Sequence, residues 1–205
     1  MTSLINKNYK IKKIPETNIT VIDNLFVDYV VDVLRLRMQI ANKFHHIYSN
    51  YASIDYYDYT DQLTKDISIE MANEFNLKDF KRAWSFVYNN IGKGVPFHAD
   101  PSNINVNIWV TPDSAILNNN KNGLTICSKN PPKNWNREQW NGNKDNCIDD
   151  FLKKEEHFNT KIDYKCNRAI LFDGALFHKT DDVETKDGIF NKRVSYTMLY
   201  GQTLE

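Results

Sequence analysis

The chain has 205 residues, of which 41% are hydrophobic, 13% aromatic and 25% charged, with only 7 Gly and 6 Pro. This composition is typical of a folded domain with a sizeable core and excludes a disordered or fibrous chain. The 26 Lys and Arg balance the 26 Asp and Glu, so general electrostatic binding to nucleic acid or to an anionic membrane is not expected.

The cysteines and the N-terminus bear on the cellular compartment. Cys127, Cys147 and Cys166 are far apart, odd in number and without a CxxC pair, which argues against a disulfide scaffold or a zinc knuckle. The first residues lack the apolar run of a signal peptide, and no segment approaches the ~18 apolar residues of a membrane span. We therefore expect a cytoplasmic protein.

The N-terminal segment, residues 1–20, is polar and basic. At most one edge strand is predicted, near Ile19–Ile22, where apolar residues gather. The basic stretch Lys10–Lys13 is most simply interpreted as a solvated tail.

A helix is predicted over residues 25–44, with Asp23 or Asn24 as its N-terminal cap. His45 and His46 are expected in its last turn, where cationic groups favour the negative end of the helix dipole; a metal role for them is the alternative. Residues at helical spacing define the stripe that we expect to be buried, namely Phe26, Tyr29, Val30, Val33, Arg37, Ala41 and Phe44.

The next two segments differ in their periodicity. Residues 48–59 carry five tyrosines without a clear period and are predicted to be irregular, with rings that partly cover the core; these are Tyr48, Tyr51, Tyr56, Tyr57 and Tyr59. A second helix is predicted over 64–77, because Ile67, Met71 and Phe75 are four residues apart.

Beyond Asp79 the period becomes that of strands, since Trp84, Phe86 and Tyr88 alternate with smaller residues. Short strand candidates separated by turn residues follow, with one helical candidate at about 149–157. The strand candidates are FVYNN, VPFHAD, INVNIWV, GLTIC, KIDYKC, RAILFDG, ALFHKT and RVSYTMLYG.

Helices followed by many short strands predict an α+β fold built on an antiparallel barrel or jelly roll. We expect one domain over 1–205, with a helical support region at 1–78 and a strand-rich core at 79–205. A long break at about 129–148 carries Trp135 and Trp140. Loops of that length are often functional, so these tryptophans either pack locally or form a lid over the barrel mouth.

His98 and Asp100 are the first candidate site residues. On a strand, residues i and i+2 point to the same face, so both side chains would project into one cavity. A 2-His-1-carboxylate facial triad for a divalent metal needs one further histidine and leaves coordination positions open. His178 is the best candidate because it begins a strand directly after RAILFDGALF. Taken alone, His98 and Asp100 are as simply read as a core histidine and a turn cap.

Arg193 is the second kind of candidate, since it shares one face of the last predicted strand with Ser195 and Thr197. An arginine that points into an apolar barrel needs an anion, and its guanidinium binds a carboxylate bidentately, with a nearby hydroxyl adding a hydrogen bond. The pattern predicts a receptor for a dicarboxylate. The alternative is an ordinary ion pair with Asp173, Asp181 or Asp182.

In this order, His98-x-Asp100, His178 and Arg193-x-Ser195 resemble the signature of the Fe(II)/2-oxoglutarate-dependent dioxygenase family, over about residues 80–201. HADPSNINVNIWVTPDSAIL and NRAILFDGALFHKT resemble an uncharacterised bacterial and phage-type subgroup. The resemblance implies a double-stranded β-helix core with N-terminal helices packed on it.

The resemblance further implies that His98, Asp100 and His178 hold Fe(II) and that Arg193 and Ser195 bind the far carboxylate of 2-oxoglutarate. It implies an oxidoreductase, in the usual outcome a hydroxylase, which uses O2 and couples oxidative decarboxylation of 2-oxoglutarate to oxidation of a substrate.

Two weaker candidates join this set. The Tyr88 hydroxyl is expected to reach the cosubstrate, although an ordinary core tyrosine fits as well. Asn107 is expected to line the cavity, because Asn105 and Asn107 alternate with aliphatic residues; simple exposure is the alternative.

Two other functions remain compatible with the sequence. One is a cupin-like metalloenzyme that does not use 2-oxoglutarate, and the other is a non-catalytic binding module on the same scaffold. The substrate is expected to be a small molecule or a side chain rather than a nucleic acid or a membrane, and nothing in the residues indicates its identity or the oligomeric state.

Overall fold

The computed structural model describes residues 3–56, 61–118, 120–142 and 146–202. Its strands are β1 (Lys10–Lys13), β2 (Thr20–Asp23), β3 (His46–Ile47), β4 (Tyr51–Tyr56), β5 (Phe80–Tyr88), β6 (Ile91–Gly92), β7 (Ile104–Trp109), β8 (Leu124–Cys127), β9 (Asn159–Ile162), β10 (Arg168–Phe172), β11 (His178–Thr180), β12 (Val183–Glu184) and β13 (Val194–Tyr200). The helices are α1 (Asp28–Gln39), α2 (Gln62–Phe75), α3 (Arg137–Trp140) and α4 (Cys147–Leu152), with 3-10 turns at Asp113–Ala115 and Ile189–Asn191.

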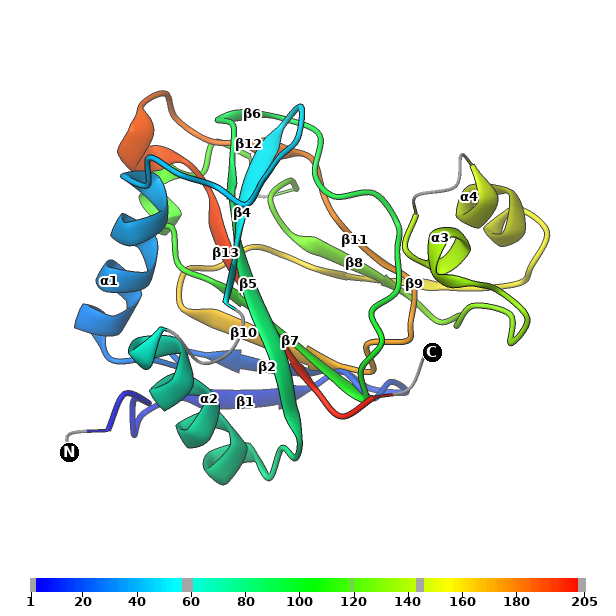
Figure 1. The fold of residues 1–205 in the computed structure, drawn as a ribbon, viewed down its shortest axis with the longest axis horizontal. Coiled ribbons are helices and arrows are strands. Elements are labelled where there is room, and N and C mark those ends of the chain that lie inside the picture. The colour runs from blue at the N-terminus through cyan, green and yellow to red at the C-terminus, as the bar shows by residue number, and fades with distance from the viewer. Residues whose placement is uncertain (1–2, 57–60, 119, 143–145, 203–205) are drawn as a thin grey trace.

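The described strands form two facing sheets and a short ribbon, all with antiparallel pairs. The main sheet has the order β1-β2-β10-β7-β13-β5-β4-β3, the minor sheet has the order β11-β8-β9, and the ribbon joins β12 to β6. Figure 1 shows α1 and α2 on one side of the main sheet, with the minor sheet on the other side and α3 and α4 beyond it. The predicted jelly-roll architecture is confirmed.

Alternate residues of the main sheet point to opposite faces, and each face packs into a hydrophobic core of its own. On the helix side of the main sheet, Val106, Ile108 and Tyr196 pack with α1 and α2. On the opposite side, Trp109 and Phe172 pack with residues of the minor sheet. Because every second residue points to the minor sheet, the intervening residues of β7 and β13 line the space between the sheets, where the candidate site lies.

The N-terminal region contributes strands as well as helices, which corrects two expectations. Lys10–Lys13 is an edge strand rather than a solvated tail, and Thr20–Asp23 lies inside the sheet between β1 and β10. All four side chains of β1 are exposed, so no apolar alternation marks this strand in the sequence. Its backbone hydrogen bonds to β2 hold it in place.

The tyrosine-rich segment 48–59 was also expected to be irregular, and this prediction is wrong over Tyr51–Tyr56. That stretch forms β4, which pairs with β5 over six residues and with β3 on its other edge. The other part of the segment includes Tyr57 and Tyr59, which lie outside the described residues.

Helix α1 is shorter than predicted. It begins after Val27, which makes no side-chain capping bond, while the predicted cap Asp23 belongs to β2. It ends at Gln39, and the chain then enters β3, so His46 lies on a strand rather than in the last helical turn.

The buried face of α1 also differs from the predicted stripe. Val30, Leu34 and Met38 are buried, whereas Tyr29 and Val33 are 53% and 45% exposed. The helix carries two apolar stripes, and helical periodicity alone does not tell which of them faces the sheet. The exposed stripe consists of Tyr29, Val33, Leu36 and Ile40.

Helix α2 confirms the second predicted helix, although it begins two residues earlier. The Asp61 carboxylate caps it by accepting the Thr64 backbone N–H at 2.9 Å. Ile67 and Met71 are buried in the helix-side core, as their spacing predicts.

Two leucines on α1 allow the choice of buried face to be tested. Leu34 is 1% exposed and Leu36 is 37% exposed. Leu34→Ala is expected to lower the free energy of unfolding by about 2–5 kcal/mol, because it leaves a cavity in the core. Leu36→Ala is expected to lower it by at most about 1 kcal/mol. Urea unfolding of both variants measures this, and equal losses would contradict the assignment of faces.

The three cysteines differ in burial. Cys127 is buried and Cys147 and Cys166 are partly buried, all as free thiols. Burial raises the pKa of Cys166 to about 12, so this group stays protonated at neutral pH. Among the described residues, no helix combines the length and the apolar character needed to cross a membrane.

Candidate metal centre

The three residues predicted as metal ligands lie together in the structure. One ligand atom from each of His98, Asp100 and His178 lies within 4.8 Å of the others. Asp100 and His178 are buried and His98 is half-buried. Nε2 of His178 is 3.4 Å from Oδ2 of Asp100, and the two imidazole rings are 4.3 Å apart. Among the described residues, no other histidine belongs to such a cluster.

Backbone hydrogen bonds, rather than a regular strand, position His98 and Asp100. The predicted strand over VPFHAD is wrong, since only His98 forms a β-bridge, to His178. In that bridge each backbone N–H donates to the carbonyl of the other residue, at 3.0 and 2.8 Å. The Asp100 N–H donates to the Gly174 carbonyl at 2.8 Å. Backbone hydrogen bonds therefore connect the segment that carries His98 and Asp100 directly to the segment that carries His178.

Gly174, in the turn between β10 and β11, permits this junction. A Cβ at this position would lie 2.1 Å from the Ser102 Oγ and 2.9 Å from the Ser102 carbonyl oxygen. Such a contact is much closer than atoms can approach, so only glycine allows the turn to pack on the segment that carries Asp100. The FDG sequence of this turn thus belongs to the construction of the site.

The tautomer of each histidine is fixed by a backbone carbonyl. Nδ1 of His98 is 2.8 Å from the Pro96 carbonyl oxygen, and Nδ1 of His178 is 2.8 Å from that of Leu176. A carbonyl only accepts, so Nδ1 carries the hydrogen and Nε2 keeps its lone pair for a metal. Burial lowers the pKa of His98 to about 4, which leaves this ring neutral at neutral pH.

Asp100 is held as a carboxylate. Burial by itself raises its pKa, but the contact with His178 and the surrounding charges, among them that of Arg82, outweigh burial and place the pKa below its ordinary value. The Asn105 side-chain amide donates to Oδ2 of Asp100 at 2.6 Å. Two neutral imidazoles and one carboxylate form the donor set that suits Fe(II) and similar divalent metals in sites with open positions.

Asn105 is a residue that the sequence reasoning missed, since it favoured Asn107. Asn105→Ala is expected to weaken metal binding by about 10–100-fold, because groups that orient a ligand contribute this much. Asn107→Ala is the matched control and is expected to leave metal affinity unchanged. Calorimetric titration with Ni(II) measures both, and an unchanged affinity of the Asn105 variant would contradict the orienting role.

Arg193 lies just before β13, and its side chain is buried at 1% exposure. Its Nε donates to the Asn122 carbonyl oxygen at 2.8 Å. The guanidinium carbon lies 4.7 Å from the ring centroid of Tyr88 and 5.6 Å from those of Trp109 and Tyr164. Its Nη1 is buried without a hydrogen-bond partner. A caged cation with an unused donor fits a carboxylate ligand.

The alternative of an ordinary ion pair does not describe Arg193. Within the described part of the chain, it forms no ion pair with Asp173, Asp181 or Asp182. Asp181 and Asp182 instead lie near Lys161 and Lys93, at 3.9 and 2.8 Å.

One strip of the inner face of the main sheet connects Arg193 with the metal cluster, the three candidate ligands His98, Asp100 and His178. Along β7, Asn105 contacts Asp100, and Trp109 lies under the guanidinium. These two residues are four positions apart, which is about 13 Å of strand. Asn107 lies between them on the same face and is partly exposed.

The remaining predicted residues lie along this strip. Asn107 donates to the Thr197 Oγ1 at 3.1 Å and accepts from the Trp109 indole N–H at 2.7 Å. The Tyr88 hydroxyl is 3.3 Å from the Thr180 Oγ1, at the Arg193 end. Ser195 is buried and lies opposite Trp109 in the register of β13 and β7.

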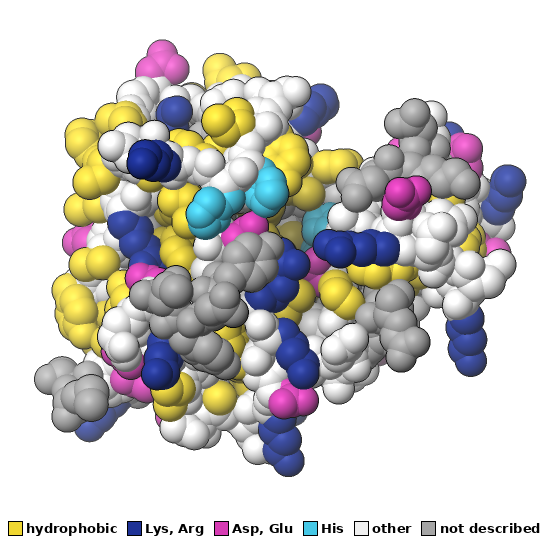
Figure 2. All heavy atoms as spheres, viewed as in Figure 1, with side chains coloured by type: hydrophobic (Ala, Val, Ile, Leu, Met, Phe, Trp, Pro, Cys, Tyr) yellow, Lys and Arg dark blue, Asp and Glu magenta, His cyan; other side chains and the backbone are white. Residues whose placement is uncertain are grey.

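A cavity of about 400 Å³ opens beside the metal cluster, with His98 and Asp100 in its wall. On this face of the molecule, histidine and basic side chains gather around a hollow (Figure 2). Helix α3 contributes Trp140 to the wall, whereas Trp135 packs on Phe151 with ring centroids 5.3 Å apart. The break at 129–148 thus contains α3 and the start of α4; residues 143–145 lie outside the described part.

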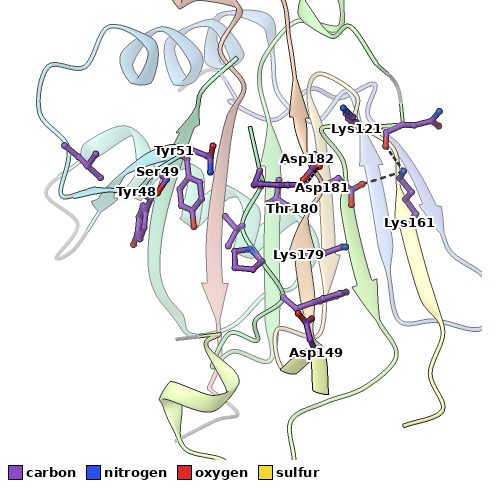
Figure 3. Close-up of a pocket in the computed structure, with 18 residues that line it drawn as sticks. Tyr48, Ser49, Tyr51, Lys121, Asp149, Lys161, Lys179, Thr180, Asp181 and Asp182 are labelled. Atoms are coloured by element: carbon purple, nitrogen blue, oxygen red, sulfur yellow. Dashed lines mark hydrogen bonds and ion pairs between the residues drawn. The ribbon is translucent and has the colours of Figure 1, made fainter. Parts of the chain in front are cut away.

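A second cavity, of about 990 Å³, lies on the other side of Val95 and Pro96, which line both. Figure 3 shows lysine and aspartate side chains along its wall, among them Lys161 beside Asp181. No member of the metal cluster lines this cavity. Of these two cavities, the smaller one therefore gives access to the candidate metal centre.

Comparisons with known proteins identify the fold. No protein-family model matches the chain, and no curated protein matches it. Similar solved structures include HygX from Streptomyces hygroscopicus with nickel and 2-oxoglutarate bound, at 9% identity and a TM-score of 0.60, covering 91% of this chain and 84% of that one.

Two further structures cover the same 91% of this chain. The non-heme alpha ketoglutarate dependent epimerase SnoN from nogalamycin biosynthesis is 8% identical, with a TM-score of 0.64 over 79% of its length. A prolyl hydroxylase from Trichoplax adhaerens, in complex with a hypoxia inducible factor peptide, is 14% identical, with a TM-score of 0.58 over 84% of its length. At these identities the likeness establishes a shared fold, the jelly roll on which these proteins are built.

Proposed function

We propose that the protein is an Fe(II)- and 2-oxoglutarate-dependent dioxygenase, acting as a hydroxylase. One observation carries the proposal: a facial triad of two histidines and one aspartate lies at one end of an inner strip, and a caged arginine with an unused donor lies at the other end. The triad fits a metal, and the arginine fits the far carboxylate of a dicarboxylate that binds the same metal.

The bound metal, with 2-oxoglutarate and O2, supplies the oxidation of a substrate C–H bond, while 2-oxoglutarate is converted into succinate and CO2. The chain's own residues prepare this chemistry. Three ligand atoms would come from one side of the metal, from His98, Asp100 and His178. The remaining coordination positions would stay open for the cosubstrate and O2. The carbonyls of Pro96 and Leu176 keep both rings in the tautomer that binds metal.

The other end of the strip orients the cosubstrate. Arg193 would bind its far carboxylate through Nη1, with the Ser195 hydroxyl nearby on the same face of β13. The Tyr88 ring supports the guanidinium from one side. Asn107, midway along the strip, presents an amide to the cosubstrate. This arrangement would orient a dicarboxylate, because the candidate metal ligands lie at one end of the strip and the buried Arg193 lies at the other.

We also infer that the chain works as one domain, in the cytoplasm. The main sheet takes β1 to β4 from the first 78 residues and its other strands from the core region, so both parts share this sheet. Three free thiols suit a reducing compartment. The substrate is expected to be a small molecule or a side chain, since the chain has no net charge.

Succinate formation from 2-oxoglutarate tests the function directly. With Fe(II) and ascorbate, the wild-type protein is expected to produce succinate even without its own substrate, through slow uncoupled turnover, and His98→Ala is expected to produce none. Metal binding without any stabilisation by 2-oxoglutarate would favour the cupin-like alternative. Absence of both metal binding and turnover would favour a non-catalytic binding module.

A further inference from the structure

Two arginines lie beside the metal centre and take no part in holding the metal or 2-oxoglutarate. Arg82 comes from β5 and Arg137 from α3, and both line the cavity of about 400 Å³ that contains His98 and Asp100. They belong to different layers of the fold, since β5 is part of the main sheet and α3 lies beyond the minor sheet. The two arginines are far apart in the sequence, and only the tertiary structure brings them to one cavity.

The sheet supplies an aromatic surface to the same cavity. Trp84 and Phe86 of β5 line it together with Tyr51 of β4. The rings of Tyr51 and Phe86 are in edge contact, with centroids 5.2 Å apart. The Arg82 guanidinium lies over the Trp84 ring, 4.7 Å from its centroid. A cationic group and flat apolar rings are thus presented side by side.

Among the charged groups that line the cavity, Arg137 is the one most available to an anionic occupant, because the charge of Arg82 already acts on Asp100. Two carboxylates line it: Asp100, whose charge would be directed at a metal, and Asp55, which is 3.0 Å from Nε2 of His46. Arg137 is exposed and forms no ion pair with any described residue. A guanidinium at the mouth of a half-enclosed cavity attracts and orients an anion, and it does so bidentately for a carboxylate or a phosphate.

We propose that the oxidised substrate carries a carboxylate or phosphate group next to a flat apolar part, such as an aromatic ring. Arg82 and Arg137 bind the anionic group, and the apolar part packs on Trp84 and Phe86 with the reacting carbon toward the metal cluster. This inference rests on the proposed function, because the metal cluster defines where oxidation occurs. A cavity of about 400 Å³ is at the small end of ligand pockets and suits one aromatic acid or side chain.

Binding of small probes to the nickel-loaded protein tests this inference. Saturating N-oxalylglycine first occupies the cosubstrate position, so that a probe does not bind at Arg193. Benzoate, phenyl phosphate and the neutral benzyl alcohol are then titrated by calorimetry. At least one anionic probe is expected to bind about tenfold more tightly than benzyl alcohol, and comparison of benzoate with phenyl phosphate identifies the preferred anion.

Variants connect the preference to the two arginines. Arg137→Gln, at an exposed position, is expected to reduce binding of the preferred anion by about tenfold and to leave benzyl alcohol unchanged, with partial recovery in Arg137→Lys. Arg82→Gln is expected to act in the same direction. Lys93→Gln, which alters a cation of the larger cavity only, is the control and is expected to have no effect.

The outcomes separate the inference from the function on which it rests. If nickel and N-oxalylglycine do not stabilise the wild-type protein, the proposed function fails, and the inference fails with it. If they do, but the neutral and anionic probes bind equally, or no probe binds, or the arginine variants bind the anions as the wild type does, only the inference is overturned.

Discussion

Replacement of Asp100 by alanine is expected to eliminate measurable Ni(II) binding and to reduce succinate formation from 2-oxoglutarate by at least about 100-fold. The carboxylate is the only anionic group of the triad, and it is held in place by Asn105 at 2.6 Å. Without it, two neutral imidazoles remain, which is a much weaker donor set for a divalent metal. Calorimetric titration and a succinate assay measure the two effects on the same preparation.

Two further variants make this result interpretable. Asp100→Asn keeps the shape of the side chain and removes its charge, so it is expected to lose metal binding while remaining folded. Asp187→Ala changes an exposed aspartate that is not part of the cluster of His98, Asp100 and His178 and is expected to retain metal binding and turnover. Normal succinate formation by the Asp100 variants would mean that the metal is held elsewhere.

Arg193→Gln is expected to raise the 2-oxoglutarate concentration needed for half-maximal turnover by about 10–100-fold and to leave Ni(II) affinity unchanged. Hydrogen bonds to charged groups contribute about 1.5–3 kcal/mol each, and about 1.4 kcal/mol corresponds to a factor of ten. Trp109, which lies under the guanidinium, and Asn105, which contacts Asp100, are about 13 Å of strand apart, so the two binding steps are expected to separate. Turnover as a function of 2-oxoglutarate concentration, with metal titration in parallel, measures the effect.

The matched control is Arg35→Gln. Arg35 lies on α1, where it pairs with Asp32 at 2.8 Å, and its replacement is expected to leave the dependence on 2-oxoglutarate unchanged. Equal dependence in the Arg193 variant would remove the cosubstrate role of this arginine. A simultaneous loss of metal binding would indicate instead that the variant disturbs the whole barrel.

The ordered pattern of polar residues made the candidate metal centre predictable from the sequence. His98 and Asp100 are two residues apart, His178 begins a strand and Arg193 directly precedes one, so the sequence alone indicated which four side chains to consider together. The reason given for the first pair was only partly right. A single bridge between His98 and His178 and a glycine turn, not a continuous strand, bring the ligands together.

Residues whose role depends on register were not predictable in the same way. Asn105 and Asn107 have the same residue type, and both lie on the inner face of β7. Only the position of Asp100 at one end of that strand decides that Asn105 orients the carboxylate. Arg82 and Arg137 likewise line one cavity only because elements that are far apart in the sequence pack together.

Exposed edges and two-sided helices were misjudged for related reasons. The side chains of β1 are all exposed, so hydrophobic alternation does not reveal a strand that is held by its backbone. Helix α1 has two apolar stripes, one with Val33 and one with Leu34. Packing against the sheet buries the stripe with Leu34 and leaves the other exposed. Such choices are fixed by long-range packing, which a local pattern does not contain.

The proposed metal and cosubstrate sites are tested together by a crystal structure of the protein with Ni(II) and N-oxalylglycine, in which anomalous scattering locates the metal. We expect one ion bound by Nε2 of His98, Nε2 of His178 and a carboxylate oxygen of Asp100, with the analogue chelating this ion and its far carboxylate on Arg193. An ion held by other residues, or an analogue whose far carboxylate does not contact Arg193, would contradict it.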